Sequence, residues 1–192
     1  MEITSAVQLR ELCETKGKTL PEMIAEYEAF RSFRTVEQVR REMAQTLAVM
    51  RSSVAEGISD PGEYAHIVKG YGARFKNAMD QGQLLGGELL KKVVLYALAV
   101  AQHNASLGRI VACPTAGSCG IVPGALLPIG EELEATDEEL IDALLVMGGV
   151  GIVSASQGPI SGAEGGCQAE CGVASAMAAG AITYLAGGSN EE

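Results

Sequence analysis

Cysteines are the residues of this 192-residue chain with the most distinctive chemistry. Four of the five cysteines form two local pairs, Cys113 with Cys119 and Cys167 with Cys171. Paired thiolates can bind zinc or an iron–sulfur cluster, but neither pair has the two-residue gap that is typical of structural zinc. The remaining thiol, Cys13, is predicted on a surface helix and is interpreted as incidental. The pattern makes the two pairs a candidate metal site without naming the metal.

Glycine is concentrated around Cys167, in the segment ISGAEGGCQAECGVASAMAAG (Ile160–Gly180). Inside a helix each glycine costs about 1 kcal/mol relative to alanine, so another interaction must offset the five glycines of this segment. Gly172, Ala176 and Gly180 recur at four-residue steps, and we expect this small-residue face to admit a second helix backbone at close range.

The other three glycines, at positions 162, 165 and 166, come just before the thiol of Cys167. One interpretation is that they leave room for a bulky inorganic group on the thiolate and offer N–H groups to its sulfur. The alternative is a glycine hinge at the start of a buried helix, with Cys167 as a small apolar residue. The segment alone does not decide between the two.

Histidine chemistry is sparse in this chain. His66 and His103 are far apart and neither lies in a Ser-His-Asp or HExxH pattern, so the sequence identifies no general base. His103 is interpreted as a cap or core residue near a helix end, where a positive charge is favourable.

The charge distribution excludes two classes of partner. The net charge is −10, and Arg109 is the only lysine or arginine from residue 97 onward. Nucleic acid and anionic membrane surfaces both require basic residues, so neither is expected as a partner. The uncharged stretches Ala143–Ala163 and Cys171–Ser189 are long enough to cross a bilayer, but they lack flanking anchors and are interpreted as buried helices. With no secretory leader and an odd number of cysteines, the chain is expected in the reducing cytoplasm.

Capping patterns predict where helices begin. Thr19–Glu22, Thr35–Gln38 and Thr136–Glu139 each place a hydroxyl three residues before a Glu or Gln, so helices are expected from about residues 20, 36 and 137. Glu88–Asn104 is interpreted as an apolar helix in preference to a strand, and Lys69–Gly87 as a long loop or loosely held hairpin.

The other predicted elements complete an all-α assignment. Cys113–Gly120 is a Gly- and Pro-containing loop, and helix is expected to resume after Pro159. The fold class is therefore all-α, with one Gly/Ala-rich helical domain of buried apolar helices over residues 1–192.

Two motifs resemble a known family. CPTAGSCGIVPG (Cys113–Gly124) and ISGAEGGCQAE (Ile160–Glu170), followed by ASAMAA (Ala174–Ala179), closely resemble the α-subunit or α-domain of iron–sulfur L-serine dehydratase. The resemblance implies an all-helical domain that binds a [4Fe–4S] cluster through three cysteines and leaves one iron open. Cys167 matches one of these ligands.

The resemblance also says which ligands to expect elsewhere. It places the other two cluster ligands in a stretch beyond Glu192, so the chain is interpreted as a truncated α-type domain that is inactive and holds its cluster poorly on its own. Cys119 falls where the family varies and does not ligate, and Cys171 falls where relatives commonly carry valine.

The implied reaction is the deamination of L-serine to pyruvate and ammonia, with the open iron acting as a Lewis acid. The implied partners are L-serine and a separate β-subunit, with a homo-oligomer left open. Thr115, Ser118 and Ser161, together with Arg109, are candidates for binding the substrate carboxylate. The alternative for the three hydroxyls is a turn-forming role, and for Arg109 a solvated surface charge.

Three rival functions are kept. A related cluster-dependent lyase acting on L-cysteine or L-threonine would use the same cluster and a different pocket. A non-catalytic helical module would bind metal through Cys113, Cys119, Cys167 and Cys171 together. A membrane helix bundle is the third.

Overall fold

The computed structural model describes residues 3–60, 62 and 70–192, which form helices and turns without any strand. The elements are α1 (Ala6–Lys16), α2 (Leu20–Ser32), α3 (Val36–Ser59), α4 (Tyr71–Asp80), α5 (Glu88–Ala105), the 3-10 turn η1 (Ala116–Ser118), α6 (Ile121–Glu132), α7 (Asp137–Gln157), α8 (Gly162–Gly165) and α9 (Cys167–Leu185). The predicted all-α class is confirmed.

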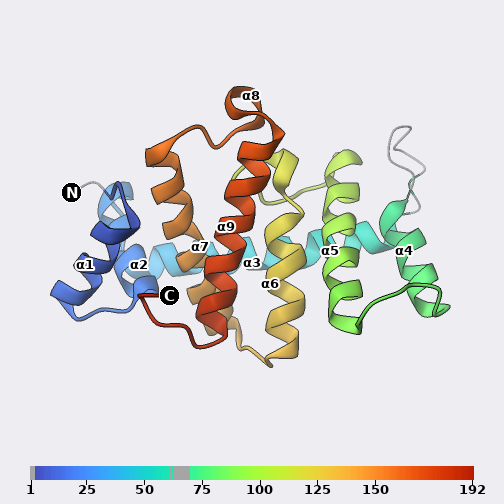
Figure 1. The fold of residues 1–192 in the computed structure, drawn as a ribbon, viewed down its shortest axis with the longest axis horizontal. Helices are drawn as coiled ribbons and strands as arrows, with labels where there is room; N and C mark the ends of the chain where they lie inside the picture. The colour runs from blue at the N-terminus through green and yellow to red at the C-terminus, as the bar shows by residue number, and fades with distance from the viewer. Residues whose placement is uncertain (1–2, 61, 63–69) are drawn as a thin grey trace.

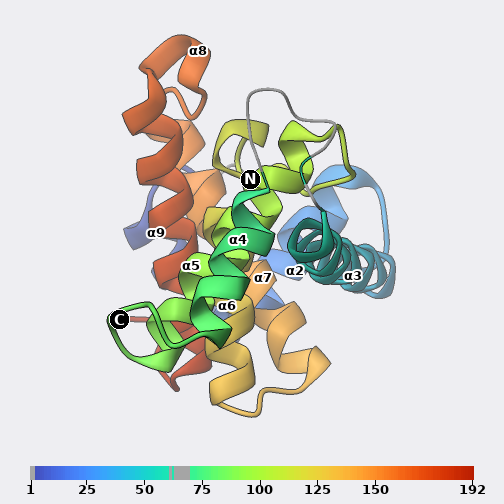
Figure 2. The same cartoon turned by 90° about the vertical axis from the view of Figure 1, so that its right-hand side faces the viewer.

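The helices form three layers. Helices α6, α5 and α4 stand side by side in a row, α9 packs against both α6 and α7, and the long helix α3 runs crosswise behind them (Figure 1). Figure 2 shows α3 end-on at one side and α9 at the opposite side, against α7 and α6. One continuous set of buried side chains, from Ile3 to Ala181, connects the layers.

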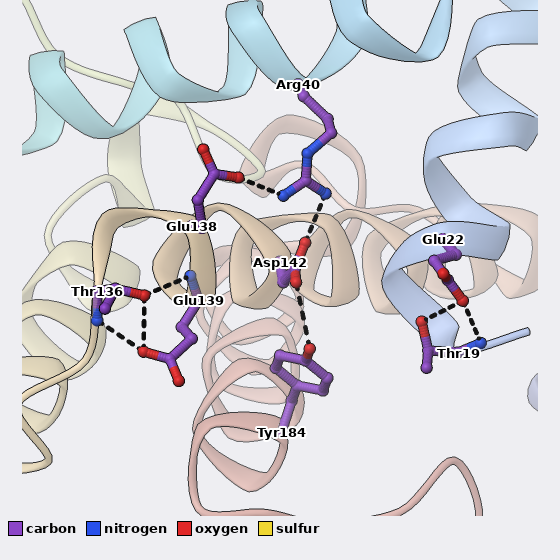
Figure 3. Close-up of polar contacts among 8 residues, drawn as sticks. All are labelled: Thr19, Glu22, Arg40, Thr136, Glu138, Glu139, Asp142 and Tyr184. Carbon is purple, nitrogen blue, oxygen red and sulfur yellow. Dashed lines mark hydrogen bonds and ion pairs between the residues drawn. The ribbon is translucent and has the colours of Figure 1, made fainter.

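The predicted helix starts are confirmed by their capping geometry. Thr35 and Thr136 each accept the backbone N–H of the residue three positions on, at 3.2 and 3.3 Å. Glu22 accepts from the backbone N–H of Thr19 at 2.8 Å, as Figure 3 shows. These bonds satisfy backbone donors that the first helical turn leaves without partners.

The loop prediction for residues 69–87 was wrong over Tyr71–Asp80, which is α4. Its two leading glycines belong to the helix and its start: Gly70 adopts the left-handed conformation at the N-cap, with φ 59°. Gly72 packs where a Cβ would lie 2.7 Å from the carbonyl oxygen of Gly57. Lys69 and His66 lie outside the described residues. The glycines of this segment were interpreted as a sign of a loop, whereas Gly70 begins a helix and Gly72 lets that helix pack closely.

Cys13 lies on a surface helix, α1, as predicted, but on the face of that helix that is turned to the core. Its side chain is 1% exposed, and together with Leu9 it forms the buried face of α1. Burial raises the pKa of the Cys13 thiol, so this cysteine is an apolar core residue.

Helix α5 touches its neighbours backbone to backbone. A Cβ at Gly57 of α3 would overlap the carbonyl group of Ala99 on α5. On the other side of α5, a Cβ at Gly124 of α6 would lie 2.7 Å from the Cβ of Ala97. These contacts explain why a core with few aromatic residues is rich in glycine, because small residues let helix axes approach closely.

Replacing Gly57 by alanine should therefore lower the free energy of unfolding by about 3 kcal/mol, the upper end for an overpacked core. Gly172→Ala is the matched control, because a Cβ at Gly172 of α9 meets nothing within 4 Å and alanine is the better helix former. The control should be neutral or stabilising by up to about 1 kcal/mol. Urea unfolding followed by circular dichroism measures both, and equal effects would contradict the packing argument.

A polar network connects three helices through Asp142 of α7. Arg40 of α3 donates to Asp142 Oδ1 at 2.6 Å and to Glu138 Oε2 at 2.7 Å, and Tyr184 of α9 donates to Asp142 Oδ2 at 3.3 Å (Figure 3). The hydrogen bonds to Glu138 and Asp142 raise the pKa of Arg40. The half-buried Asp142 thereby holds α3 and α9 on opposite sides of α7.

Asp142→Ala should lower the free energy of unfolding by about 2 kcal/mol, because two donors lose a charged acceptor in a half-buried setting. Glu138→Ala removes the other carboxylate of the same arginine, but its side chain is 75% exposed. That change should cost about 0.5 kcal/mol or less. Thermal and urea unfolding compare the two variants, and a Glu138→Ala loss as large as that of Asp142→Ala would contradict the role given to Asp142.

One helical stretch among the described residues, Asp137–Gly165, is long and apolar enough to span a membrane by length and composition. Its main part, α7, contacts α2, α3 and α9 and carries much of the buried core. The apolar composition of α7 is thus explained by its position between layers. The expectation of a buried helix for Ala143–Ala163 holds for Ala143–Met147 and Gly149, whereas the last residues of α7, from Ala155 to Gln157, are exposed.

Candidate functional site

Two glycine-containing loops meet at one end of the helical array. The first, residues 113–120, contains η1 and leads from α5 to α6, and the second, residues 158–166, contains α8 and leads from α7 to α9. Figure 1 shows α8 at the end of the array where α9 begins, and η1 contacts α9. Cys167, the first residue of α9, lies at this junction.

Glu170 joins the two loops. The hydroxyl of Thr115 donates a short hydrogen bond to Glu170 Oε2. A Cβ at Gly117 in the first loop would lie 2.8 Å from Glu170 Oε1, and a Cβ at Gly162 in the second would lie 2.6 Å from the same oxygen. The carboxylate therefore occupies a gap that exists because both loops carry glycine where they face it.

The first loop is held by polar contacts of its own. It begins with a cis peptide bond between Cys113 and Pro114. Asn104 of α5 donates from Nδ2 to the carbonyl of Ala116 at 3.1 Å. Ser118 is 2% exposed, and its hydroxyl lies 3.3 Å from the carbonyl oxygens of Cys113 and Thr115. These contacts favour the turn-forming interpretation of Ser118 over its predicted contact with substrate.

The other predicted polar residues occupy different positions. Thr115 and Ser161 are half-buried, and Ser161 is the residue directly before α8. Arg109 is exposed and lies beside Ser52 and Glu56 of α3, lining a cavity of about 350 Å³. His103 is 9% exposed, which agrees with the prediction of a core residue. Glu170 thus contacts Thr115 of the first loop and faces Gly162, the residue after Ser161, in the second, and the structure places Arg109 against α3 instead.

The four paired cysteines do not converge. Cys113 and Cys119 are each 2% exposed, and burial raises the pKa of the Cys113 thiol to about 12 and raises that of Cys119. Cys167 is exposed, with its Sγ 3.8 Å from the Sγ of Cys171. Within the described ranges no group of three or more His, Cys, Asp or Glu side chains is placed to hold a metal ion. The four-cysteine module is therefore not formed by these residues.

The glycines before Cys167 serve several purposes. Gly162 faces the Glu170 carboxylate, as above, and a Cβ at Gly165 would lie 2.6 Å from the Cβ of Ala169. Gly166 has φ 78°, a conformation that L residues rarely adopt, and a Cβ there would meet nothing within 4 Å. Open space next to the Cys167 thiol is thus present at Gly166. At Gly162 and Gly165 the space is occupied by the side chains of Glu170 and Ala169.

The predicted small-residue face of α9 was largely wrong. Gly172 has open space around it and Ala176 is exposed, so no helix of the described chain approaches there. Only Gly180 fits the prediction, because a Cβ there would lie 2.9 Å from Val150 Cγ2 on α7.

The site can supply one thiolate ligand to a metal group. Cys167 is exposed at the start of α9, and the open space at Gly166 and Gly172 leaves room beside this turn of the helix. Thiolates are the ligands that hold iron–sulfur clusters, so the residue type and its exposure fit such a group. The donor set within the described ranges is incomplete, because Cys171 is its only neighbouring thiol.

Sequence reasoning missed two residues that organise the site, Glu170 and Asn104. Glu170 lies inside the motif that was singled out, and a lone acid in an otherwise uncharged helix was the signal available. Asn104 ends an apolar helix and gave no signal, since its partner is a backbone carbonyl twelve residues away.

Comparison with known proteins identifies the family. The serine dehydratase alpha chain family matches residues 15–192. The chain is 34% identical over 192 residues to the L-serine dehydratase alpha chain of Peptoniphilus asaccharolyticus and 36% identical over 185 residues to the probable alpha chain of Bacillus subtilis. It is also 31% identical over 192 residues to L-serine dehydratase 2 of Escherichia coli.

These matches cover 99%, 96% and 97% of this chain, but 65%, 62% and 42% of the respective relatives. The chain therefore belongs to the serine dehydratase alpha chain family, and it spans less than two thirds of the length of these relatives. The predicted family resemblance is confirmed.

Thiol labelling tests the placement of the cysteines. At neutral pH, an alkylating reagent should modify Cys167 first and leave Cys13, Cys113 and Cys119 intact until the protein unfolds. Burial both blocks access and keeps those three thiols protonated, because their pKa values are raised and only the thiolate reacts. Peptide mapping by mass spectrometry gives the order, and early labelling of Cys113 would contradict the site as described.

Proposed function

We propose that this chain is part of the cluster-binding α component of an enzyme that converts L-serine to pyruvate and ammonia. The observation that carries the proposal is the family match together with the exposure of Cys167 in the family's Gly-Cys-Gln motif. The whole described chain is interpreted as one α-type domain, and a β component as its partner. The five free thiols support a reducing compartment, which we take to be the cytoplasm.

The cofactor in this proposal is a [4Fe–4S] cluster, with Cys167 as the ligand that this chain contributes. When bound, the cluster supplies a Lewis acid that weakens the bond between the substrate's β-carbon and its hydroxyl oxygen. We propose that the remaining ligands come from residues outside the part of the protein that the structure describes. Cys171 is not assigned as a ligand, because it falls where the resemblance places a valine in relatives.

The chain's own residues are assigned to substrate positioning. Thr115 and Ser161 bring hydroxyl groups from two different loops to the end of α9 that carries Cys167. The Thr115 hydroxyl is held by Glu170 before substrate arrives, which lowers the ordering cost of binding. Ser161 is placed by its backbone carbonyl, which accepts from the N–H groups of Glu164 and Gly165. Ser118 keeps the first loop in shape from inside, and we propose no direct contact between Ser118 and serine.

A pair of cysteine variants tests the metal assignment in the complete enzyme with its partner component. After anaerobic reconstitution with iron and sulfide, Cys167→Ser should lose most of the bound iron and acid-labile sulfide, and serine turnover should fall by at least about a hundredfold. Cys171→Ser removes the adjacent thiol and should keep both the bound iron and sulfide and the serine turnover of the wild-type enzyme.

Three results would contradict the proposal. Wild-type enzyme without bound iron would exclude the cluster, and wild-type enzyme with iron but without pyruvate production from L-serine would exclude the reaction. Equal losses in Cys167→Ser and Cys171→Ser would mean that the two thiols act together and that the single-ligand assignment is wrong. The turnover of L-threonine and of L-cysteine, compared with that of L-serine in the same preparation, identifies which amino acid is the preferred substrate.

A further inference from the structure

A carboxylate with an unusual setting lies one turn into α9. Glu170 is half-buried, and its carboxylate is faced by two glycines from different loops, Gly117 and Gly162. Among the residues that the structure describes, its side chain accepts one hydrogen bond, from the hydroxyl of Thr115. A carboxylate partly removed from water needs such a donor, because burial without hydrogen bonds is costly.

We infer that Glu170 is a positioning residue that fixes the hydroxyl of Thr115 and ties the loop of residues 113–120 to the loop of residues 158–166. This inference rests on the proposed function, because it concerns the same substrate site. The two loops join different helix pairs and are far apart in sequence, so a contact between them sets the width of the site.

The direction of the hydrogen bond has a chemical consequence for Thr115. An ionised carboxylate only accepts, so the Thr115 hydroxyl must donate its single proton to Glu170. The oxygen of Thr115 then keeps its lone pairs for other donors. Ser118 Oγ lies 3.3 Å from this oxygen, but its single proton faces the carbonyl oxygens of Cys113 and Thr115, so at least one lone pair of Thr115 is left for a hydrogen-bond donor on the substrate. Such a donor is the ammonium group of an amino acid, and the negative charge of Glu170 favours it.

The test uses Glu170→Ala and Glu170→Gln in the complete enzyme, with Glu164→Ala as the matched control. Glu164 is an exposed acid on α8, so its removal changes the net charge equally and leaves the Thr115 contact in place. Glu170→Ala should lower kcat/KM for L-serine by about tenfold to a hundredfold, with most of the change in KM. Glu170→Gln keeps an acceptor oxygen and should recover part of the loss, whereas Glu164→Ala should match wild type.

A second measurement does not depend on turnover. Hydrogen exchange of the backbone amides in residues 113–120 and 158–166 should accelerate in Glu170→Ala and in Thr115→Val, and the double variant should add little to either single one. Additive acceleration, or unchanged exchange in Glu170→Ala, would overturn the inference.

The outcomes separate the inference from the proposed function. If wild-type enzyme turns over L-serine and Glu170→Ala equals Glu164→Ala in KM and kcat, the role of Glu170 is wrong and the proposed function stands. If wild-type enzyme shows no serine turnover, the proposed function fails, and the exchange data alone then decide whether Glu170 joins the loops.

Discussion

The structure depends on the close approach of helix backbones at glycine positions, where no side chain separates them. At Gly57 the backbone of α3 reaches the backbone of α5, and at Gly124 the backbone of α6 reaches the same helix from the other side. A single added methyl group at either position would separate helices that share the core. Few large side chains are then needed to fill the space, in keeping with a composition that has 24 glycines, three phenylalanines and no tryptophan.

Glycines also permit a close contact at the end of the array that carries the candidate site. There Gly117 and Gly162, from two loops, leave room for the carboxylate of Glu170. The helix α9 therefore has two roles within its first turn. Cys167 is exposed and free to bind a metal group, whereas Glu170 is directed into the protein and holds the loops that carry Thr115 and Ser161. Ligand binding and loop positioning are thus separated on one short piece of helix.

Much of this arrangement could be predicted from the sequence where the signal is local. The capping boxes at Thr19, Thr35 and Thr136 predicted helix starts because capping depends on residues three positions apart. The two motifs that carry the family resemblance are short and unusual enough to identify the family. The apolar helix from Glu88 was predicted correctly for the same reason, since periodicity and length are properties of one segment.

The misses share a physical origin in contacts between segments far apart in sequence. Gly72 suggested a loop, but its place in α4 is set by its close approach to Gly57 of α3 and Ala99 of α5. Burial of Cys13 depends on which face of a weakly amphipathic helix meets the core. Glu170 could not be assigned without knowing that a loop beginning some fifty residues earlier lies beside it, as its hydrogen bond to Thr115 across 55 positions illustrates.

The claim that Gly162 is present to admit the Glu170 carboxylate can be measured directly by a double-mutant cycle on the free energy of unfolding. Gly162→Ala should destabilise the wild-type chain by about 1 kcal/mol, because the added Cβ displaces a carboxylate held by Thr115. In the Glu170→Ala background the same substitution should be neutral or stabilising, since the obstructing group is gone. An equal change in both backgrounds would show that the glycine and the carboxylate are independent, and would contradict this account of the site.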